Sequence, residues 1–411
     1  MPTGDDTLVT VDAHVMEPTD LWSSRLPKSL HGIADLAPVY RRLPGSNKAF
    51  EINGKAIGIT PEYRRYSSET EFVDIGPDDI DGHLRDMDSD GVTAEVVHPN
   101  AGLFIYDLEN PDLAYACAEI YNDHMVELYE SDRIRTNAII PVLDADRSVS
   151  EIDRIAKLGI HGIELPQTAP AETPYYTSFW DPIWEAAQRN GVVVAMHIGT
   201  GPFGGKGGGG SPSRPFKPRA VPEEEPTRER MLVSRRLTRG GFGGLGGECL
   251  ETMPDLIGAG VCERYPDLHF VFVEVGGKWL AGFMDHLDDA FYVGPGVRLV
   301  KRVFFNDDGS EVPQFVPGEL ELEWDYPLAP SDYIKRQMHV SFMDDFAALR
   351  NRGVTGVAPL LWGNDYPHYE GSWPNSREAI EHQCARADLT DEERAAIFGG
   401  TTAKLWGITL N

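Results

Sequence analysis

Eight short apolar runs alternate with segments of helical periodicity along this chain of 411 residues, and this alternation limits its fold more than any other feature. The runs that we expect to be strands are residues 8–15, 92–97, 134–143, 160–165, 192–198, 268–275, 337–342 and 360–365. Strands that alternate with helices pair in parallel, because each helix returns the chain to the same edge of the sheet. Eight such units predict an α/β protein with a closed (β/α)8 barrel of the TIM type; an open doubly wound sheet is the alternative.

Helical segments separate the expected strands and close the chain. We expect helices over residues 78–90, 111–130, 147–158, 179–189, 249–263, 279–290, 345–352, 376–386 and 391–398. Three longer segments, residues 22–74, 200–247 and 293–332, do not fit a minimal barrel, and we expect the first of them to be irregular. Each follows a strand or the helix beside it, where the loops at the top face of a barrel lie. The sequence therefore predicts one barrel domain over residues 1–411 with these three insertions, and the glycine-rich ends of 200–247 predict a lid or a subunit-contact arm.

The acidic balance of the chain limits its partners. Lys and Arg total 37 and Asp and Glu total 65, which gives a formal net charge of −28. Nucleic acids and anionic membrane surfaces both require a basic patch, so we expect neither as a partner. The four cysteines form no C-x-x-C pair, the N-terminus lacks the features of a signal peptide, and no apolar run is long enough to span a membrane. These observations predict a cytoplasmic protein with reduced thiols.

Acidic and histidine side chains stand at the ends of five expected strands. They are Asp12 and His14 in the first strand with Glu17 just beyond it, Glu164 in the fourth, His197 in the fifth, Glu274 in the sixth, and Asp365 in the eighth with His368 three residues later. The carboxyl ends of barrel strands form the active-site face. Residues i and i+2 of a strand share one face, so Asp12 and His14 can both point into the barrel. Unpaired carboxylates are costly to bury, and a divalent cation would satisfy several of them at once.

Other residues of these types are expected to be structural. We expect His98, His161 and His339 to be core or rim residues, and Glu164 could equally pair with a basic side chain inside the barrel. The glycine run at residues 204–210 follows a strand but lacks both a Gly-Lys-Ser/Thr sequence and the Rossmann spacing. We therefore expect no nucleotide site there.

Four segments carry a resemblance to a known family. The sequence VDAHVMEPTDLW at residues 11–22 resembles the opening motif of the amidohydrolase-related family. This is the branch of the amidohydrolase superfamily that includes the aminocarboxymuconate-semialdehyde decarboxylase-like enzymes. MHIG at 196–199, RYPDLHFVFVEVGGKW at 264–279 and WGNDYPHYEGSWP at 362–374 resemble the segments of its fifth, sixth and eighth strands, in the same order.

The resemblance implies a (β/α)8 barrel and a metal site. The implied ligands are Asp12, His14, His197 and Asp365. This chain departs from many members at two positions, because Asp12 stands where they have His or Glu and Glu274 stands where they have His. The resulting carboxylate-rich site favours Zn, Mn or Fe with mixed nitrogen and oxygen ligands. We expect one ion, and a second becomes feasible if Glu164 bridges the two and His368 lies nearby.

Three functions are compatible with this site. The first is a metal-dependent decarboxylase or hydrolase that acts on a small carboxylate-bearing substrate, with Asp365 as ligand and proton shuttle and with Glu274 and His368 orienting the substrate or moving protons. The second is a dinuclear Fe or Mn/Fe monooxygenase, because a few relatives that resemble this longer branch are dinuclear Fe or Mn/Fe oxygenases. The third is a catalytically silent subunit that pairs with an active homologue and retains a structural metal. We expect a homo-oligomer, or a hetero-oligomer with a homologue.

Overall fold

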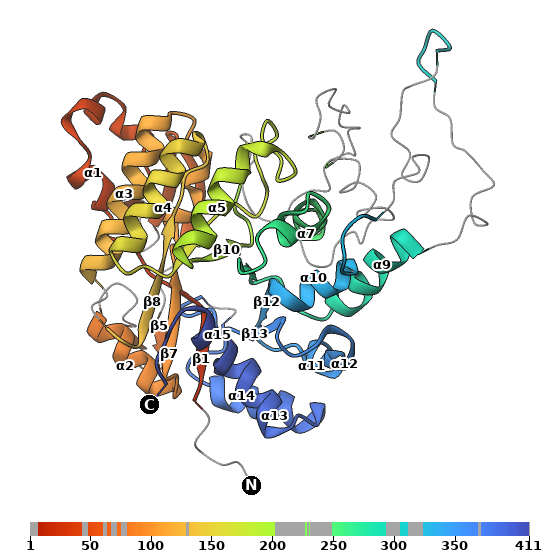
Figure 1. The fold of residues 1–411 in the computed structure, drawn as a ribbon. Helices are drawn as coiled ribbons and strands as arrows, with labels where there is room; N and C mark the ends of the chain where they lie inside the picture. Colours follow the sequence, from red (N-terminus) through yellow and green to blue (C-terminus); the bar gives the residue numbers. More distant parts are fainter. Residues whose placement is uncertain are drawn as a thin grey trace.

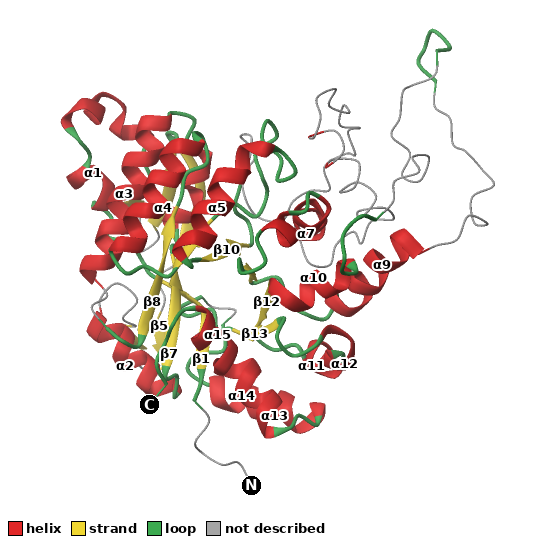
Figure 2. Ribbon diagram, viewed as in Figure 1, coloured by secondary structure: helices red, strands yellow, loops and turns green. Residues whose placement is uncertain are grey.

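Eight parallel strands form the central sheet of the computed structural model, and helices surround them (Figures 1 and 2). The structure describes residues 7–42, 48–60, 64–66, 72–74, 80–128, 131–201, 227, 230, 249–292, 305–310, 324–368 and 371–410. In sheet order the strands are β1 (Val9–His14), β7 (Ala94–His98), β8 (Ile134–Ile139), β9 (Gly162–Glu164), β10 (Val193–His197), β11 (Phe270–Val273), β12 (Met338–Phe342) and β13 (Leu360–Trp362). Sheet order follows chain order, as it does in a (β/α)8 barrel.

The first and last strands of this sheet meet and close it. A parallel bridge joins Ala13 of β1 to Tyr366, just beyond β13. All eight expected strands are present, and the predicted (β/α)8 barrel is confirmed. An open doubly wound sheet would leave β1 and β13 apart, so that alternative is wrong.

Helices connect consecutive strands and follow the last one. They are α2 (Ile80–Asp90), α3 (Pro111–Leu128), α4 (Ala145–Lys157), α5 (Asp181–Asn190), α7 (Cys249–Gly258), α8 (Val261–Arg264), α9 (Leu280–Tyr292), α10 (Pro330–Gln337), α11 (Phe346–Arg350), α12 (Arg352–Thr355), α13 (Ser376–Ala387), α14 (Asp391–Ala395) and α15 (Thr401–Leu405). The single helix expected over 249–263 is divided into α7 and α8, because Gly260 adopts a φ of 70° and interrupts the helical hydrogen bonds. No helix among the described residues is both long and apolar enough to cross a membrane.

Helix α4 shows how local sequence sets these elements. The side chain of Asp144 accepts a hydrogen bond from the backbone N–H of Arg147 and caps the amino end of the helix. Ile152 and Ile155 lie on one face of the helix and are fully buried. Gly159, just past the end, has a φ of 84°, which a residue with a side chain rarely adopts. The glycine thus marks the end of the helix expected over residues 147–158.

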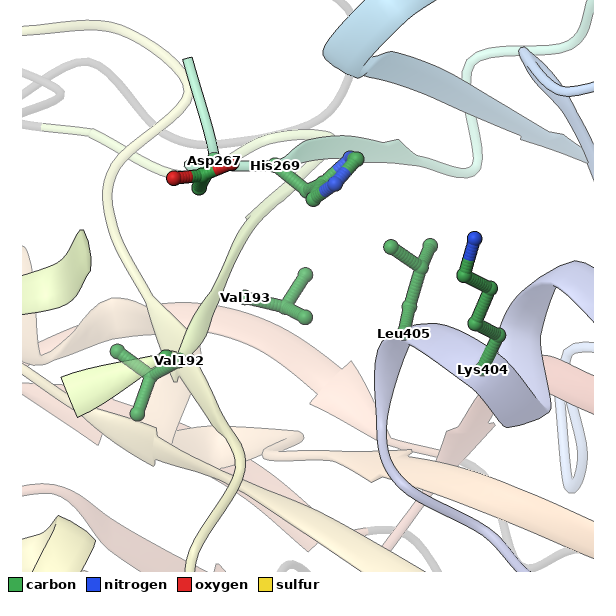
Figure 3. A pocket seen from close by; sticks show the side chains of 7 residues that line it. Val192, Val193, Asp267, His269, Lys404 and Leu405 are labelled. Atoms are coloured by element: carbon green, nitrogen blue, oxygen red, sulfur yellow. The ribbon is translucent and has the colours of Figure 1, made fainter. Parts of the chain in front are cut away.

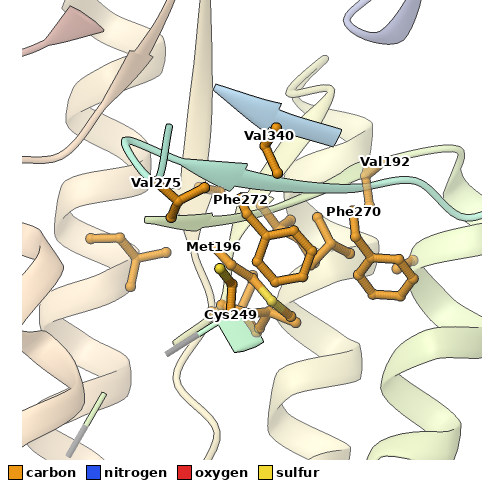
Figure 4. Close-up of a cluster of buried hydrophobic side chains, with 14 of the residues drawn as sticks. Val192, Met196, Cys249, Phe270, Phe272, Val275 and Val340 are labelled. Atoms are coloured by element: carbon orange, nitrogen blue, oxygen red, sulfur yellow. The ribbon is translucent and has the colours of Figure 1, made fainter. Parts of the chain in front are cut away.

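Side chains alternate between two buried clusters along the barrel strands. The residues of β10 and β11 that point into the barrel are Val193, Ala195, Val271 and Val273. Met196 and Phe272 point the other way and join Cys249 of α7 in the layer between strands and helices (Figure 4). His197 continues the inward series of Val193 and Ala195, so alternation alone places it inside the barrel.

The insertion at residues 22–74 contains regular structure that was not expected. It holds α1 (Leu21–Arg25), the 3-10 helix η1 (Lys28–Leu36), the antiparallel sheet β2 (Val39–Arg42), β3 (Lys48–Ile52) and β4 (Lys55–Thr60), and the pair β5 (Arg64–Tyr66) and β6 (Phe72–Asp74). Asn53 and Gly54 join β3 to β4 with φ values of 52° and 66°, and Asn-Gly is the strongest short hairpin signal in a sequence. The expectation of an irregular segment was therefore wrong.

The other two insertions lie largely outside the described residues. Of 200–247 the structure describes only 200, 201, 227 and 230, and of 293–332 it describes 305–310 and 324–332. Helix α10 begins within the latter segment. A lid or subunit-contact arm at 200–247 stays a prediction.

Candidate metal centre

An irregularity in β1 turns two of the predicted ligands into the barrel. A β-bulge lies between Thr10 and Ala13, where β1 has one more residue than its partner β7. Strict alternation from the inward-facing Val11 would leave Asp12 and His14 on the outer face of the barrel. The extra residue reverses this order, and Asp12 and His14 are buried inside, 1% and 0% exposed.

The closure of the barrel brings Asp365 next to these two residues. The backbone N–H of Asp365 donates to the carbonyl of Asp12 at 2.8 Å, just beyond the end of β13. Gly363 permits this approach, because a Cβ at this position would lie 2.4 Å from the Cβ of Asp12. Asp365 has a φ of 54°, a conformation that residues other than glycine rarely adopt and that occurs often at functional sites.

Three of the predicted ligands, Asp12, His197 and Asp365, lie within 4 Å of Nε2 of the fourth, His14. Nε2 of His14 lies 3.6 Å from Oδ1 of Asp12 and 3.5 Å from Oδ1 of Asp365. Nε2 of His197, at the end of β10, lies 3.2 Å from the same His14 atom. The strands that carry these residues are far apart in sequence, so only the barrel brings them together.

The hydrogen bonds of the two imidazoles leave their Nε2 atoms available as ligands. Nδ1 of His14 lies 3.0 Å from the carbonyl of Pro99, and Nδ1 of His197 lies 3.0 Å from that of Ile198. A carbonyl only accepts, so both Nδ1 atoms donate and, in neutral rings, the facing Nε2 atoms carry lone pairs. Burial acts to lower the pKa of His197, but Asp12 and other nearby carboxylates raise it to about 10. The site thus favours a positive charge where the two nitrogens meet.

The donor atoms fit a divalent metal ion. Oδ1 of Asp12 and Oδ2 of Asp365 are buried, yet they accept no hydrogen bond from the described part of the chain. Buried oxygens without a partner are rare and costly. Ligand atoms held about 2.0–2.2 Å from an ion lie roughly 3.0–3.5 Å apart, which is close to the separations found between these donors.

The geometry around His14 favours a single ion. Two groups of potential ligands lie close enough together, Asp12 with His14 and His197, and His14 with Asp365 and His368. Both include His14, whose Nδ1 is already bonded to a carbonyl, so only Nε2 can bind a metal. The two groups therefore share one donor atom, Nε2 of His14, and one imidazole nitrogen binds one ion.

Glu274 reaches the rim of this centre through an unusual backbone conformation. It follows β11 with a φ of 61°, and Ser341 of β12 accepts a hydrogen bond from its backbone N–H at 2.6 Å. Its Oε2 lies 3.7 Å from Nε2 of His197. Burial raises the pKa of Glu274 to about 7; His197 opposes this effect, and the charges of Asp12 and Asp365 add to it. A carboxyl group in this state can exchange a proton near neutral pH.

His368 links Asp365 to the opening of the site. Nδ1 of His368 donates to Oδ1 of Asp365 at 2.7 Å, and its ring packs against that of His14 with centroids 4.2 Å apart. Its side chain is 17% exposed, in contrast to the fully buried Asp365. Burial raises the pKa of Asp365 to about 6, although the hydrogen bond from His368 acts in the opposite direction.

Glu164, the predicted bridging carboxylate, belongs to neither group of ligands among the described residues. Its Oε1 accepts from Nδ1 of His98 at 2.5 Å and from Nδ2 of Asn137 at 2.9 Å. Nε2 of His98 donates to the carbonyl of Val11, and Oδ1 of Asn137 accepts from the indole N–H of Trp406. Oε1 of Glu164 thus pairs with a histidine inside the barrel, whereas its Oε2 is buried without a hydrogen-bond partner among the described residues. The sequence had left a basic partner or a metal open.

This arrangement predicts that Glu164→Gln keeps one metal ion per chain and most of the activity. The amide preserves the shape of the side chain but removes the charge that faces His98, and hydrogen bonds to charged groups contribute about 1.5–3 kcal/mol. We expect unfolding in urea to show that the free energy of unfolding of the variant is lower by about 1.5–3 kcal/mol. Elemental analysis of the purified variant gives the metal content. Loss of half of the metal, together with oxygen-dependent turnover, would instead identify Glu164 as the bridge of a two-ion centre.

The opposite end of the barrel holds a separate cavity and two of the histidines expected to be structural, His161 before β9 and His339 in β12. The cavity, of about 120 Å³, is lined by Gly191, Val192, Val193, Asp267, His269, Lys404 and Leu405 (Figure 3). It lies at the amino ends of β10 and β11, whereas the candidate ligands follow the carboxyl ends. His339 contacts His269 here, and its Nδ1 donates to the carbonyl of Ala358. Its structural role is confirmed.

Ser341 is the residue of the site that the sequence analysis missed. It is 1% exposed, bonds to the backbone of Glu274, and its Oγ lies 3.5 Å from Oδ2 of Asp12. The signal was present in the sequence, because Ser341 is a polar residue near the end of the expected strand 337–342, as the other site residues are in theirs.

Comparison with known proteins decides the family. A sequence model described as amidohydrolase matches residues 59–314, more than half of the chain. The chain belongs to the amidohydrolase family. This amidohydrolase is therefore an enzyme, and the family expected from its motifs is confirmed. No curated protein matches it.

Solved structures share the barrel of this amidohydrolase at low sequence identity. An amidohydrolase from Mycobacterium avium subsp. paratuberculosis has a TM-score of 0.66 and 16% identity, over 98% of this chain and 100% of the other. A 5-carboxyvanillate decarboxylase from Sphingomonas paucimobilis has a TM-score of 0.57 and 18% identity, again over 98% and 100%. A dihydroxybenzoic acid decarboxylase from Polaromonas sp., with bound manganese and the inhibitor 2-nitroresorcinol, has a TM-score of 0.56 and 15% identity, over 99% and 98%. At these identities the likeness shows the fold alone.

Proposed function

We propose that this amidohydrolase is a decarboxylase that depends on one divalent metal ion and acts on a small aromatic carboxylate. The observation that carries the proposal is the arrangement of Asp12, His197 and Asp365 around Nε2 of His14, in which one buried oxygen of Asp12 and one of Asp365 have no hydrogen-bond partner among the described residues. The substrate class follows the structural neighbours, two of which are decarboxylases of substituted benzoates.

The donor set is suited to several divalent ions, and we propose Mn²⁺ as the first to test. Two carboxylates and two imidazoles form a mixed oxygen and nitrogen set, which suits Mn, Zn and Fe. One of the structural neighbours holds manganese. When bound, the ion would act as a Lewis acid toward an oxygen atom of the substrate.

The protein side chains would orient the substrate and supply the proton that the ring carbon takes up. In decarboxylation the bond between the ring carbon and the carboxyl carbon breaks, CO2 leaves, and the electron pair left on the ring carbon takes up a proton. Asp365 can bind the ion through one oxygen and face the substrate with the other. His368 fixes the orientation of Asp365 through the hydrogen bond to its Oδ1. Glu274 stands at the partly exposed side of the site, where it can orient the substrate or return the proton.

The other functions considered find less support in the site. Hydrolysis would use the same residues and remains within the family, so it is the main competitor. A dinuclear oxygenase needs a second ion, but only Nε2 of His14 is available as a ligand, and Glu164 belongs to neither group of potential ligands among the described residues. A catalytically silent subunit could keep the same ligands around a structural metal, but the match to a family of enzymes speaks against it.

The cellular setting and assembly follow from weaker observations. All four cysteines are buried and none forms a disulfide, as expected for a protein of a reducing compartment, and this supports the proposed cytoplasmic location. A homo-oligomer, or a hetero-oligomer with a homologue, stays a prediction.

Metal removal and restoration test the proposed function. We expect the chelated protein to be inactive, and one equivalent of Mn²⁺ or Zn²⁺ per chain to restore CO2 release from substituted hydroxybenzoates. Elemental analysis gives the stoichiometry, and the aromatic absorbance follows the substrate. Hydrolysis of esters or amides without CO2 release would favour the competitor, and wild-type protein that binds no metal would reject the proposal as a whole.

A further inference from the structure

The Glu17 side chain is a buried carboxylate that the proposed reaction does not use. It is 4% exposed and lies three residues beyond His14. Its Oε1 accepts hydrogen bonds from the backbone N–H groups of Asn100 at 3.0 Å and Gly102 at 2.9 Å, and its Oε2 accepts from that of Ala101 at 3.0 Å. Both oxygens are therefore bonded to the loop that follows β7.

This loop also carries the carbonyl that orients His14. Pro99 directly precedes the three amides, and its carbonyl accepts from Nδ1 of His14 at 3.0 Å. The loop is closely packed: a Cβ on Gly102 would lie 2.6 Å from Cδ1 of Ile139 and 3.3 Å from Oε1 of Glu17. The position of the Pro99 carbonyl thus depends on a short segment that Glu17 fixes at three consecutive amides.

We infer that Glu17 is a positioning residue for the metal centre, which sets the orientation of His14 through the backbone of residues 99–102. The inference rests on the proposed metal site. The carbonyl of Pro99 directs the proton of His14 to Nδ1, so that Nε2 presents a lone pair to the ion. Glu17 holds that carbonyl in place from the opposite side of the loop, without a contact to the ion or the substrate.

Glutamine at position 17 has nearly the volume of glutamate but cannot accept the same three backbone hydrogen bonds. The three amides are all donors and are shared between both oxygens of the carboxylate. The NH2 group of glutamine would therefore face at least one N–H group, and the loop would have to shift. Groups that orient a ligand without touching the metal contribute about 10–100-fold to metal affinity.

The test measures metal affinity and folding separately on the full chain. We expect Glu17→Gln to weaken the binding of Mn²⁺ to the metal-free protein by about 10–100-fold in a chelator competition. The Co²⁺-loaded variant should show an altered visible absorption spectrum, since the angle of one imidazole changes. Thermal unfolding of the metal-free protein reports any loss of stability. Glu17→Asp keeps the charge but moves the carboxylate away from the amides, so it should weaken Mn²⁺ binding less than Glu17→Gln. This variant replaces the glutamine variant in the test if the latter does not fold.

Glu151→Gln is the matched control. Glu151 is 5% exposed and accepts hydrogen bonds from Asn122 and Arg154 on the outer side of the barrel. We expect this variant to lose stability and to bind Mn²⁺ as wild type does. Folded Glu17 variants with wild-type affinity and an unchanged Co²⁺ spectrum would overturn the inference, even where their stability falls. Failure of the wild type to bind metal would instead overturn the proposed function.

Discussion

Alanine in place of His197 or of His14 is expected to remove most of the bound metal and to lower the activity by more than about 100-fold. Groups that only orient a metal ligand already contribute about 10–100-fold to metal affinity or activity. Each residue supplies an Nε2 atom at the point where the four donors meet. Alanine supplies no donor, and the remaining carboxylates would repel one another without the ion. Elemental analysis of protein purified without added metal measures the loss.

His161→Ala is the control for these two variants. His161 immediately precedes β9, at the opposite end of the barrel from the ligands, and is exposed to solvent. We expect it to keep the wild-type metal content and activity. Equal metal content in all three variants would show that the ligands have been assigned to the wrong residues.

Asparagine in place of Asp365 is expected to lower kcat by roughly 10²–10⁴-fold, the range typical of a lost acid or base. The amide has nearly the same shape as the carboxylate, and its oxygen can still accept from His368. It carries neither the charge that binds the ion nor a proton that it can release to the substrate. Steady-state kinetics at saturating Mn²⁺ separates this effect from weaker metal binding.

Asp144→Asn is the control for Asp365→Asn, because it makes the same chemical change away from the site. Asp144 caps α4 through the backbone N–H of Arg147, and asparagine is an equally good capping residue. Its kcat should equal that of the wild type. A folded Asp365→Asn protein with one ion per chain and unchanged kcat would exclude Asp365 from proton transfer.

The sequence predicted the strands and most of the helices because the signals are local. Apolar runs of four to eight residues, capping residues such as Asp144 and glycines such as Gly159 act over a few neighbouring positions. The residues that end the apolar strands identified the face of the barrel where the chemistry lies. The same signals failed at residues 22–74, where the hairpin at Asn53–Gly54 was passed over, and at Gly260, which divides an expected helix.

The sequence did not show how Glu164 and Glu274 would be used. The partner of Glu164 is His98, which lies 66 residues away along the chain, and no local pattern links them. Glu274 follows the inward-facing Val273 and would point outward in a regular strand. Its positive φ and the hydrogen bond to Ser341 of the next strand return it to the site.

Sequence alone determined which side chains are available at the carboxyl ends of the strands; the tertiary structure decided which of them meet. Asp12 and His14 share a face by their spacing, but the bulge in β1 decides that this face is the inner one. Gly363 allows β13 to approach Asp12, and this contact joins residues from the two ends of the chain. Bulges and barrel closure depend on how distant strands pack against each other, and a single strand does not encode that packing in its own periodicity.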